Sequence, residues 1–134
     1  MRTGGCQCGS IRYECADEPV QLYVCHCIEC RKQSASAFGI SYEVKRGDFR
    51  LTCGAPAFFT RDADSGGKVE CAFCPACGTR LWHQSSAEAV TLTVKGGSLD
   101  APLDLSNAVH IWTSRRLPGV VIPENAARFD QEPD

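Results

Sequence analysis

Residues 73–79 read FCPACGT, a knuckle whose two thiols, Cys74 and Cys77, are poorly spaced to bridge each other. A second pair, Cys6 and Cys8, lies far upstream as C-x-C. Two such pairs suit one tetrahedral zinc ion, because four cysteine sulfurs can converge on it at about 2.3 Å. We therefore predict that the fold brings the two pairs together, and that a structural zinc ties the N-terminal strand to the middle of the sequence.

Proline and glycine suit the turns that such a site requires. Pro75 fixes one backbone dihedral, and Gly78 tolerates a positive φ where amides turn toward the thiolates. Gly5 and Gly9 flank the other pair in the same way. We expect both pairs to lie on tight turns.

An iron–sulfur cluster, a reactive dithiol and a disulfide scaffold are the alternatives to zinc. Cys71, Cys74 and Cys77 match the first three cysteines of a bacterial ferredoxin run, but Leu81 stands where the fourth would be. Disulfide scaffolds are typical of secreted proteins with evenly spread cysteines, whereas seven of the ten cysteines here fall into tight clusters. The pattern therefore favours zinc.

A third cluster, Cys25, Cys27 and Cys30, offers three further thiols in the stretch CHCIEC. Three protein ligands are the number that a catalytic zinc keeps when its fourth position is open. We predict a second zinc here, with these cysteines as the catalytic-site ligands. A fourth protein ligand could instead close the site, and the spare thiols and imidazoles are Cys15, Cys53, Cys71, His26, His83 and His110.

The spare cysteines are interpreted as core residues rather than ligands. Cys71 alternates with Val69 and Phe73, which favours an inward-facing position, and free cysteine is often buried in that role. Cys53 and Cys15 are interpreted in the same way.

Two histidines are assigned from the residues beside them. His26 lies between two proposed ligands, so in an extended backbone its side chain points to the opposite side, toward packing rather than metal. His110 alternates away from the apolar residues Val109 and Ile111, so we expect it at the surface or lining a pocket.

Composition limits the class of protein. The sequence contains 134 residues, with a net charge of −2 and 43% hydrophobic residues, so we expect one zinc-binding domain over residues 1–134 rather than a disordered tail or a basic nucleic-acid binder. The N-terminus lacks the apolar stretch of a signal peptide, and no segment approaches the ~18 apolar residues of a membrane span. We expect a cytoplasmic protein with no membrane or nucleic-acid partner, where reducing conditions direct cysteine toward metal chemistry.

Hydrophobic residues alternate with period two in several segments, which predicts half-buried strands and a mainly β protein. These segments are 20–24, 38–44, 49–53, 90–94 and 109–111. A turn is expected at 64–67 and a frayed acidic tail at 130–134. A single helical turn from Ile28 to about Ser34 would begin inside the cysteine triplet, where backbone N–H groups favour thiolates.

Four motifs taken together resemble one known family. They are G-G-C-x-C-G followed by I-R-Y, then C-H-C-x-x-C-R-K, then F-C-P-x-C-G-T, and, toward the C-terminus, H-I-W before I-P. The sequence resembles the glutathione-dependent formaldehyde-activating enzyme family, which includes centromere protein V and shares the Mss4-like fold. The match runs from about Gly4 to Phe129.

This resemblance implies a mainly β, Mss4-like fold of small antiparallel sheets stapled by two zinc ions. Residue by residue, Cys6, Cys8, Cys74 and Cys77 match the family's structural site, and Cys25, Cys27 and Cys30 match its proposed catalytic site. The sequence departs from the family at Ala35, where a glycine is common, and at Cys71, which is not a family hallmark.

The resemblance also implies a carbon–sulfur lyase resembling S-(hydroxymethyl)glutathione synthase, with glutathione and formaldehyde or related small molecules as partners. Three thiolates make zinc a weak Lewis acid that suits capture of a substrate thiol. Glutathione carries two carboxylates, for which Arg31, Lys32, Arg115 and Arg116 are candidate partners. The alternative is a non-catalytic, zinc-stabilised binding module, and the fourth position at the triplet separates the two.

Overall fold

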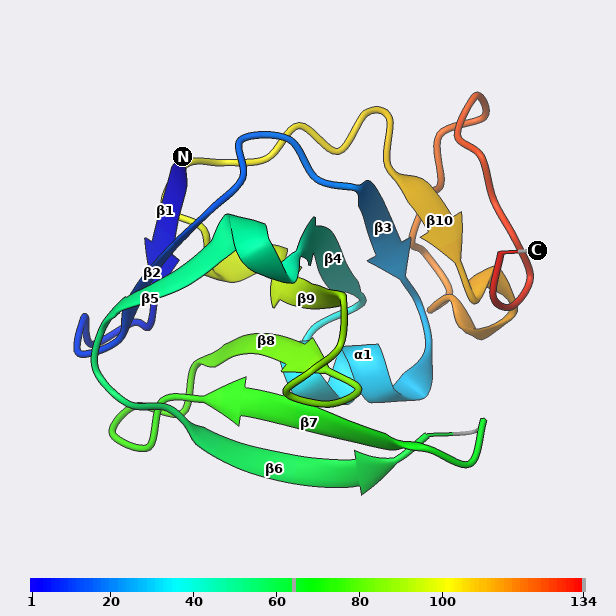
Figure 1. Cartoon of the computed structure of the whole chain (residues 1–134). Helices are drawn as coiled ribbons and strands as arrows, with labels where there is room; N and C mark the ends of the chain where they lie inside the picture. Colours follow the sequence, from blue (N-terminus) through cyan, green and yellow to red (C-terminus); the bar gives the residue numbers. More distant parts are fainter. Residues whose placement is uncertain (64, 134) are drawn as a thin grey trace.

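A computed structural model describes residues 1–63 and 65–133, so Asp64 of the turn predicted at 64–67 lies outside the described residues. The described part of the protein is mainly β, as predicted, and its strands form two sheets (Figure 1). The smaller sheet is antiparallel, with the order β1 (Arg2–Gly5), β2 (Arg12–Cys15) and β5 (Phe49–Cys53). The larger sheet has the order β10 (Val109–Ile111), β3 (Gln21–Cys25), β4 (Gly39–Lys45), β9 (Thr91–Lys95), β8 (Arg80–Gln84), β7 (Lys68–Phe73) and β6 (Ala57–Asp62).

Neighbouring strands of the larger sheet are antiparallel except at one edge. There β10 runs parallel to β3, with His110 beside Val24. Over residues 1–63 and 65–133 the helical elements are one α-helix and three short 3-10 turns: α1 (Ile28–Ser34), η1 (Arg46–Asp48), η2 (Gly96–Ser98) and η3 (Thr113–Arg115). No helix among the described residues combines the length and the apolar character that a bilayer crossing demands.

All five strand segments predicted from alternation are strands, namely β3, β4, β5, β9 and β10. The alternation did not predict strands at β1, β2, β6 and β8. For β7 it predicted only that Cys71 faces inward. Two causes are visible: β1 contains two glycines, and the edge strand β6 exposes both of its adjacent phenylalanines, Phe58 and Phe59. A bulge between Ala72 and Phe73 also breaks the period where β7 pairs with β8.

One face of the larger sheet forms the main hydrophobic core. Tyr42, Val94, Trp82 and Ala72 lie side by side across β4, β9, β8 and β7, and all four are buried. They pack in one cluster with Tyr13 from the smaller sheet. The two sheets therefore share this core, whose formation is driven by burial of apolar surface.

The opposite face of the larger sheet is covered by α1. A Cβ atom on Gly39 of β4 would lie 3.0 Å from Cys30 Cβ and 3.2 Å from Ser34 Oγ, so glycine lets the helix lie this close to the strand without a shift of its side chains. At the far edge, Arg61 of β6 lies 3.7 Å from Glu29 of the same helix. Both a central and an edge strand thus reach α1, and the sheet curves around it (Figure 1).

The helix begins and ends as the sequence indicated. Cys27 is the N-cap residue, and its sulfur accepts a hydrogen bond from Cys30 N at 3.3 Å. At the other end Ala35 adopts the left-handed conformation, with φ 48° and ψ 45°. An L-residue with a Cβ is disfavoured there, which gives a physical reason for the glycine that the family resemblance implies at this position.

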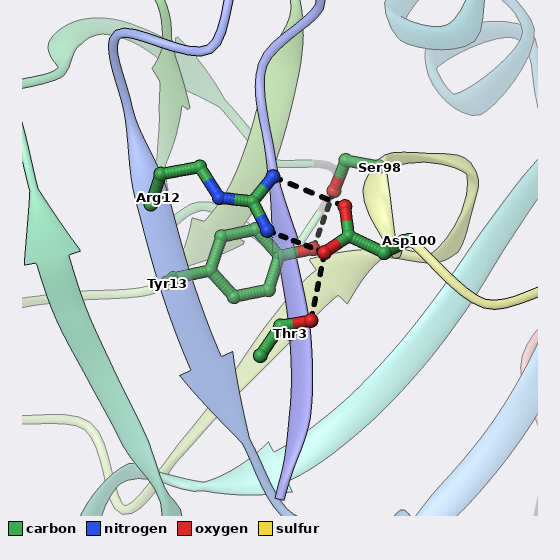
Figure 2. Close-up of polar contacts among 5 residues, drawn as sticks. All are labelled: Thr3, Arg12, Tyr13, Ser98 and Asp100. Carbon is green, nitrogen blue, oxygen red and sulfur yellow. Dashed lines mark hydrogen bonds and ion pairs between the residues drawn. The ribbon is translucent and has the colours of Figure 1, made fainter.

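A polar network fastens the smaller sheet to the turn that follows β9 (Figure 2). The Asp100 carboxylate accepts two bonds from the Arg12 guanidinium and one from Thr3 Oγ1 at 2.7 Å. Tyr13 O–H donates to Ser98 Oγ at 2.6 Å, and the Ser98 hydroxyl donates onward to a main-chain carbonyl. These bonds fix the 96–100 segment against β1 and β2.

The predicted fraying of the C-terminal tail is wrong for residues 130–132. Trp112 N donates to Gln131 O at 3.0 Å, and Ser114 Oγ donates to Asp130 O at 2.6 Å. The Trp112 indole also donates to the Glu132 carboxylate at 2.8 Å. The acidic segment is held because it satisfies donors of the turn after β10, while Asp134 lies outside the described residues.

Candidate metal centres

The two distant cysteine pairs meet, as their spacing predicted. The sulfur atoms of Cys6, Cys8, Cys74 and Cys77 all lie within 4.8 Å of one another, a separation that a single ion can satisfy. The first pair follows β1, and the second lies in the connection between β7 and β8. This group, the four-cysteine cluster, could hold a metal ion.

Both pairs lie on turns that pass through a glycine with positive φ. At Gly78 φ is 84°, and the Cys77 amide donates to Cys74 Sγ at 3.4 Å. The other turn uses Gly9, with φ 80°, and Cys6 Sγ accepts the amide five residues further on at 3.2 Å. The expectation of tight turns with amides facing sulfur is confirmed.

Hydrogen bonds favour thiolates at two members of the four-cysteine cluster, Cys6 and Cys77. The Thr79 hydroxyl accepts from Gln7 N at 3.0 Å, so its own proton is directed to Cys77 Sγ at 3.3 Å. The Thr79 hydroxyl and amide lower the pKa of Cys77 to about 5. Burial opposes ionisation of Cys6, but hydrogen bonds, that of the Ile11 amide foremost, outweigh it and lower its pKa to about 7. Thiols that ionise near neutral pH fit the donor set that a metal requires.

The second group, the triplet, consists of Cys25, Cys27 and Cys30, whose sulfur atoms also lie within 4.8 Å of one another. Cys25 is the last residue of β3, Cys27 caps α1, and Cys30 lies in the first turn of the helix. Cys25 and Cys30 are buried, whereas Cys27 is half-buried. A strand end and a helix start therefore aim three thiols at one point.

One negative charge is already favoured in the triplet before a metal binds. The neighbouring side chains of Cys25 and Cys30 lower the pKa of Cys27 to about 2, with a further contribution from the Cys30 amide, which donates to Cys27 Sγ at 3.3 Å. The pKa of Cys25 is raised in turn by the Cys27 and Cys30 side chains and by burial. A divalent ion would displace the remaining thiol protons, so this donor set also fits a metal.

Among the described residues, no further histidine, cysteine or carboxylate joins either group of sulfurs. His26 is buried away from the triplet, as predicted, and its Nε2 lies 3.0 Å from His110 Nδ1. The prediction that His110 lies at the surface or lines a pocket is wrong, because this side chain is buried against His26 and Phe129 N donates to its carbonyl. Burial lowers the pKa of His26 to about 4, so both rings pack as neutral imidazoles.

The spare cysteines divide between core and surface. Cys15 and Cys71 are buried, as predicted. The same prediction is wrong for Cys53, which is exposed, because β5 is an edge strand whose residues after Phe49 face solvent. His83 pairs with Cys71 across β7 and β8, outside the triplet.

A cavity of about 610 Å³ opens beside the triplet. Cys27 is the cluster cysteine that lines it, together with residues from α1, from the β6–β7 hairpin and from the C-terminal segment. Arg61 and Arg115 supply positive charge, and Glu29 and Glu132 supply negative charge. Trp112, held at φ 55° in the H-I-W motif, forms part of the wall. The half-buried thiol thus faces a pocket able to hold a small molecule that carries both charges.

Two of these features were not predicted from the sequence. Trp112 was seen only as part of a motif, and its left-handed backbone has no local signal such as glycine or asparagine. Arg61 reaches the site because the edge strand curves back to α1, which no local pattern indicates.

The described residues combine a mainly β fold with a four-cysteine and a three-cysteine cluster. The protein therefore belongs to the class of small β proteins with clustered cysteine thiols that could bind metal. A family model described as "Glutathione-dependent formaldehyde-activating enzyme" matches residues 1–115, and the chain belongs to this family. A crystal structure of a Rhodobacter sphaeroides protein shares the fold, with a TM-score of 0.61 and 21% identity, covering 81% of this chain and 98% of that one. Membership supports a formaldehyde-activating function in the broad sense.

Proposed function

We propose that the protein is a zinc-dependent carbon–sulfur lyase that joins a thiol such as glutathione to formaldehyde or a related small carbonyl. The observation that carries this proposal is the triplet: three convergent thiols, no fourth protein ligand among the described residues, and a cavity at Cys27. Three ligands with an open position are the usual arrangement of catalytic zinc. The four-cysteine cluster would hold the structural zinc.

In this proposal Cys25, Cys27 and Cys30 hold the second zinc, which when bound supplies a site where a substrate thiol loses its proton. The new bond forms between the thiol sulfur and the carbonyl carbon. The π electron pair of the carbonyl moves to its oxygen, which takes up one proton to give the hydroxymethyl product. No redox equivalent or leaving group is needed.

The role of the cavity residues is to bind and orient the two reactants. Glutathione carries one ammonium and two carboxylates, which the mixed charges of Arg61, Arg115, Glu29 and Glu132 can match. Of the cations that the sequence analysis named as candidates, Arg115 lines this cavity. Arg31 and Lys32 lie in the last turn of α1 and line a different hollow. Trp112 would exclude water from one side.

The location that we propose is the cytoplasm. All ten cysteines are unbridged, which suits a reducing compartment where glutathione is abundant as thiol.

The experiment combines zinc X-ray absorption with nuclear magnetic resonance exchange between glutathione and formaldehyde. We expect glutathione to add one sulfur scatterer at one of two zinc sites, and the protein to speed exchange above the uncatalysed rate. Cys27→Ala should abolish both effects. Cys53→Ala is the matched control, because it removes an exposed cysteine that belongs to neither cluster.

Four protein ligands at each zinc and an unchanged spectrum with glutathione would overturn the lyase proposal. The protein would then be a zinc-stabilised binding module.

A further inference from the structure

A second cavity, of about 500 Å³, borders the four-cysteine cluster at Cys77. Its walls come from the end of α1, from the knuckle that leads into β8 and from the turn after β9. The charged side chains among its lining residues are Arg80 and Lys95, and none of the lining residues is acidic. The cavity therefore has a positive lining that neither cluster explains.

Three of the lining residues carry a nitrogen atom that is buried without a hydrogen-bond partner: Lys95 Nζ, Arg80 Nη1 and Gln33 Nε2. Lys95 is only 5% exposed. Within the described part of the protein, neither Lys95 nor Arg80 forms an ion pair. Buried polar groups are normally paired, and a buried ammonium without a partner is costly. Three such donors around one cavity indicate a ligand that supplies acceptors and negative charge.

The donors are held in place before any ligand binds. The Arg80 guanidinium lies 5.8 Å from the ring centroids of both Phe59 and Phe73, which fixes its plane. The absent side chain of Gly39 leaves space for Lys95 Nζ, which would lie 3.0 Å from a Cβ there. Ser98, another lining residue, is fixed by the network of Figure 2. Such preorganisation lowers the entropic cost of binding.

The negative charge of the triplet can account for the buried position of one of these donors, Lys95, but not of all three. Lys95 and Cys30 are neighbours across Gly39, so the ammonium lies close to the triplet. Arg80 and Gln33 line the same cavity, and Arg80 forms no ion pair within the described part of the protein. A planar guanidinium fork beside an ammonium matches the two oxygens of a carboxylate.

We propose that this cavity is a carboxylate-binding site for a small organic acid, with Lys95, Arg80 and Gln33 as its donors. The carboxylate has two sources, the thiol substrate itself or a separate acid. The proposal stands without the lyase reaction, because none of the three donors is a cluster cysteine.

The experiment is calorimetric titration of the zinc-loaded full-length protein with succinate, and with S-methylglutathione, which keeps both carboxylates but has no free thiol. The variants are Arg80→Gln and Lys95→Gln. Arg50→Gln is the matched control, since it removes the same charge from a surface ion pair with Glu14. We expect Arg80→Gln to raise the succinate Kd by about tenfold or more, as for loss of a charged hydrogen bond, and Arg50→Gln to leave it unchanged.

Competition identifies the source. Mutually exclusive binding of S-methylglutathione and succinate, with the same loss in Arg80→Gln, assigns the carboxylate to the thiol substrate, whereas simultaneous binding assigns it to a separate acid. The proposal is wrong if succinate does not bind the wild-type protein, or if Arg80→Gln binds it as Arg50→Gln does. Should Lys95→Gln fail to fold, Arg80→Gln alone decides. Cys27→Ala, which tests the lyase proposal, should keep its succinate affinity, so the two proposals can fail separately.

Discussion

The four-cysteine cluster and the triplet contain the same chemical group in different surroundings. Cys6 and Cys74 are members of the main hydrophobic core, packed in one cluster with Ile11, Tyr13 and Leu81. The triplet lies in a separate, smaller apolar cluster around Ile111, which the C-terminal segment completes. A metal bound in the first would be part of the core, whereas a metal bound in the second would lie at its margin, beside a cavity.

The clusters also differ in what they connect. Cys8 and Cys74 are 66 residues apart, so a metal between them closes a long loop. The triplet spans one strand end and one helix turn, already positioned by the cap at Cys27 and by the His26–His110 contact. A metal that closes a long loop stabilises the fold. A metal between ligands that are already adjacent contributes less to stability, so its site can be used for catalysis instead.

The sharpest test of this difference is loss of one ligand from each cluster. Cys74→Ala should unfold or aggregate the protein, because zinc-site binding energies of about 10–16 kcal/mol rival the whole stability of a domain. Cys27→Ala should keep most of the fold. Thermal melts and circular dichroism measure both, with Cys53→Ala as control. Equal collapse of the two variants would mean that the triplet metal is structural too.

Metal removal should separate the clusters next. We expect two zinc ions per purified protein molecule, and a chelator should take the triplet ion first because its fourth position opens on a cavity. Zinc content should then fall to one while circular dichroism stays unchanged, and loss of the second ion should coincide with unfolding. Elemental analysis measures the content. A starting value of one or none, or simultaneous release, contradicts the difference.

His110→Ala should have a moderate effect, confined to the wall of the triplet. It removes the partner of His26 Nε2 at 3.0 Å and leaves that nitrogen buried, at a cost of about 1–3 kcal/mol. The chelator should also extract the triplet zinc faster from this variant. Denaturant unfolding and release kinetics measure the two effects. Unchanged release with lowered stability would show that the histidine pair does not support the triplet.

The smallest expected effect is a gain from Ala35→Gly. A left-handed residue with a Cβ costs about 1–2 kcal/mol, and the greater unfolded-state entropy of glycine offsets part of the relief, so stability should rise by about 0.5–1 kcal/mol. Thermal melts at equal zinc content measure it, with Ala37→Gly, two residues further along, as control. A destabilised Ala35→Gly would show that the helix end is held by contacts other than its backbone conformation.

Prediction from the sequence succeeded where the physical signal was local. Ligand spacing in C-x-C, C-x-x-C and CHCIEC is a property of a few adjacent residues, and it identified both clusters. Burial of Lys95 was not predictable, since the alternation in Thr91–Lys95 places it on the polar face and only the position of α1 covers it. His110 was misplaced for the same reason: the C-terminal segment that covers its strand comes later in the sequence.

The distance in sequence between partners also orders events during synthesis. A ribosome adds about 5–20 residues per second, so the Cys6 and Cys8 thiols wait roughly 3–13 s for the knuckle 66 residues away from Cys8 to emerge. His110 must be made before it can meet His26, 84 residues earlier, so the triplet's wall is finished later still. The nascent protein can thus complete its four-cysteine cluster before the wall of the triplet, although the three triplet thiols themselves are made earlier than Cys74.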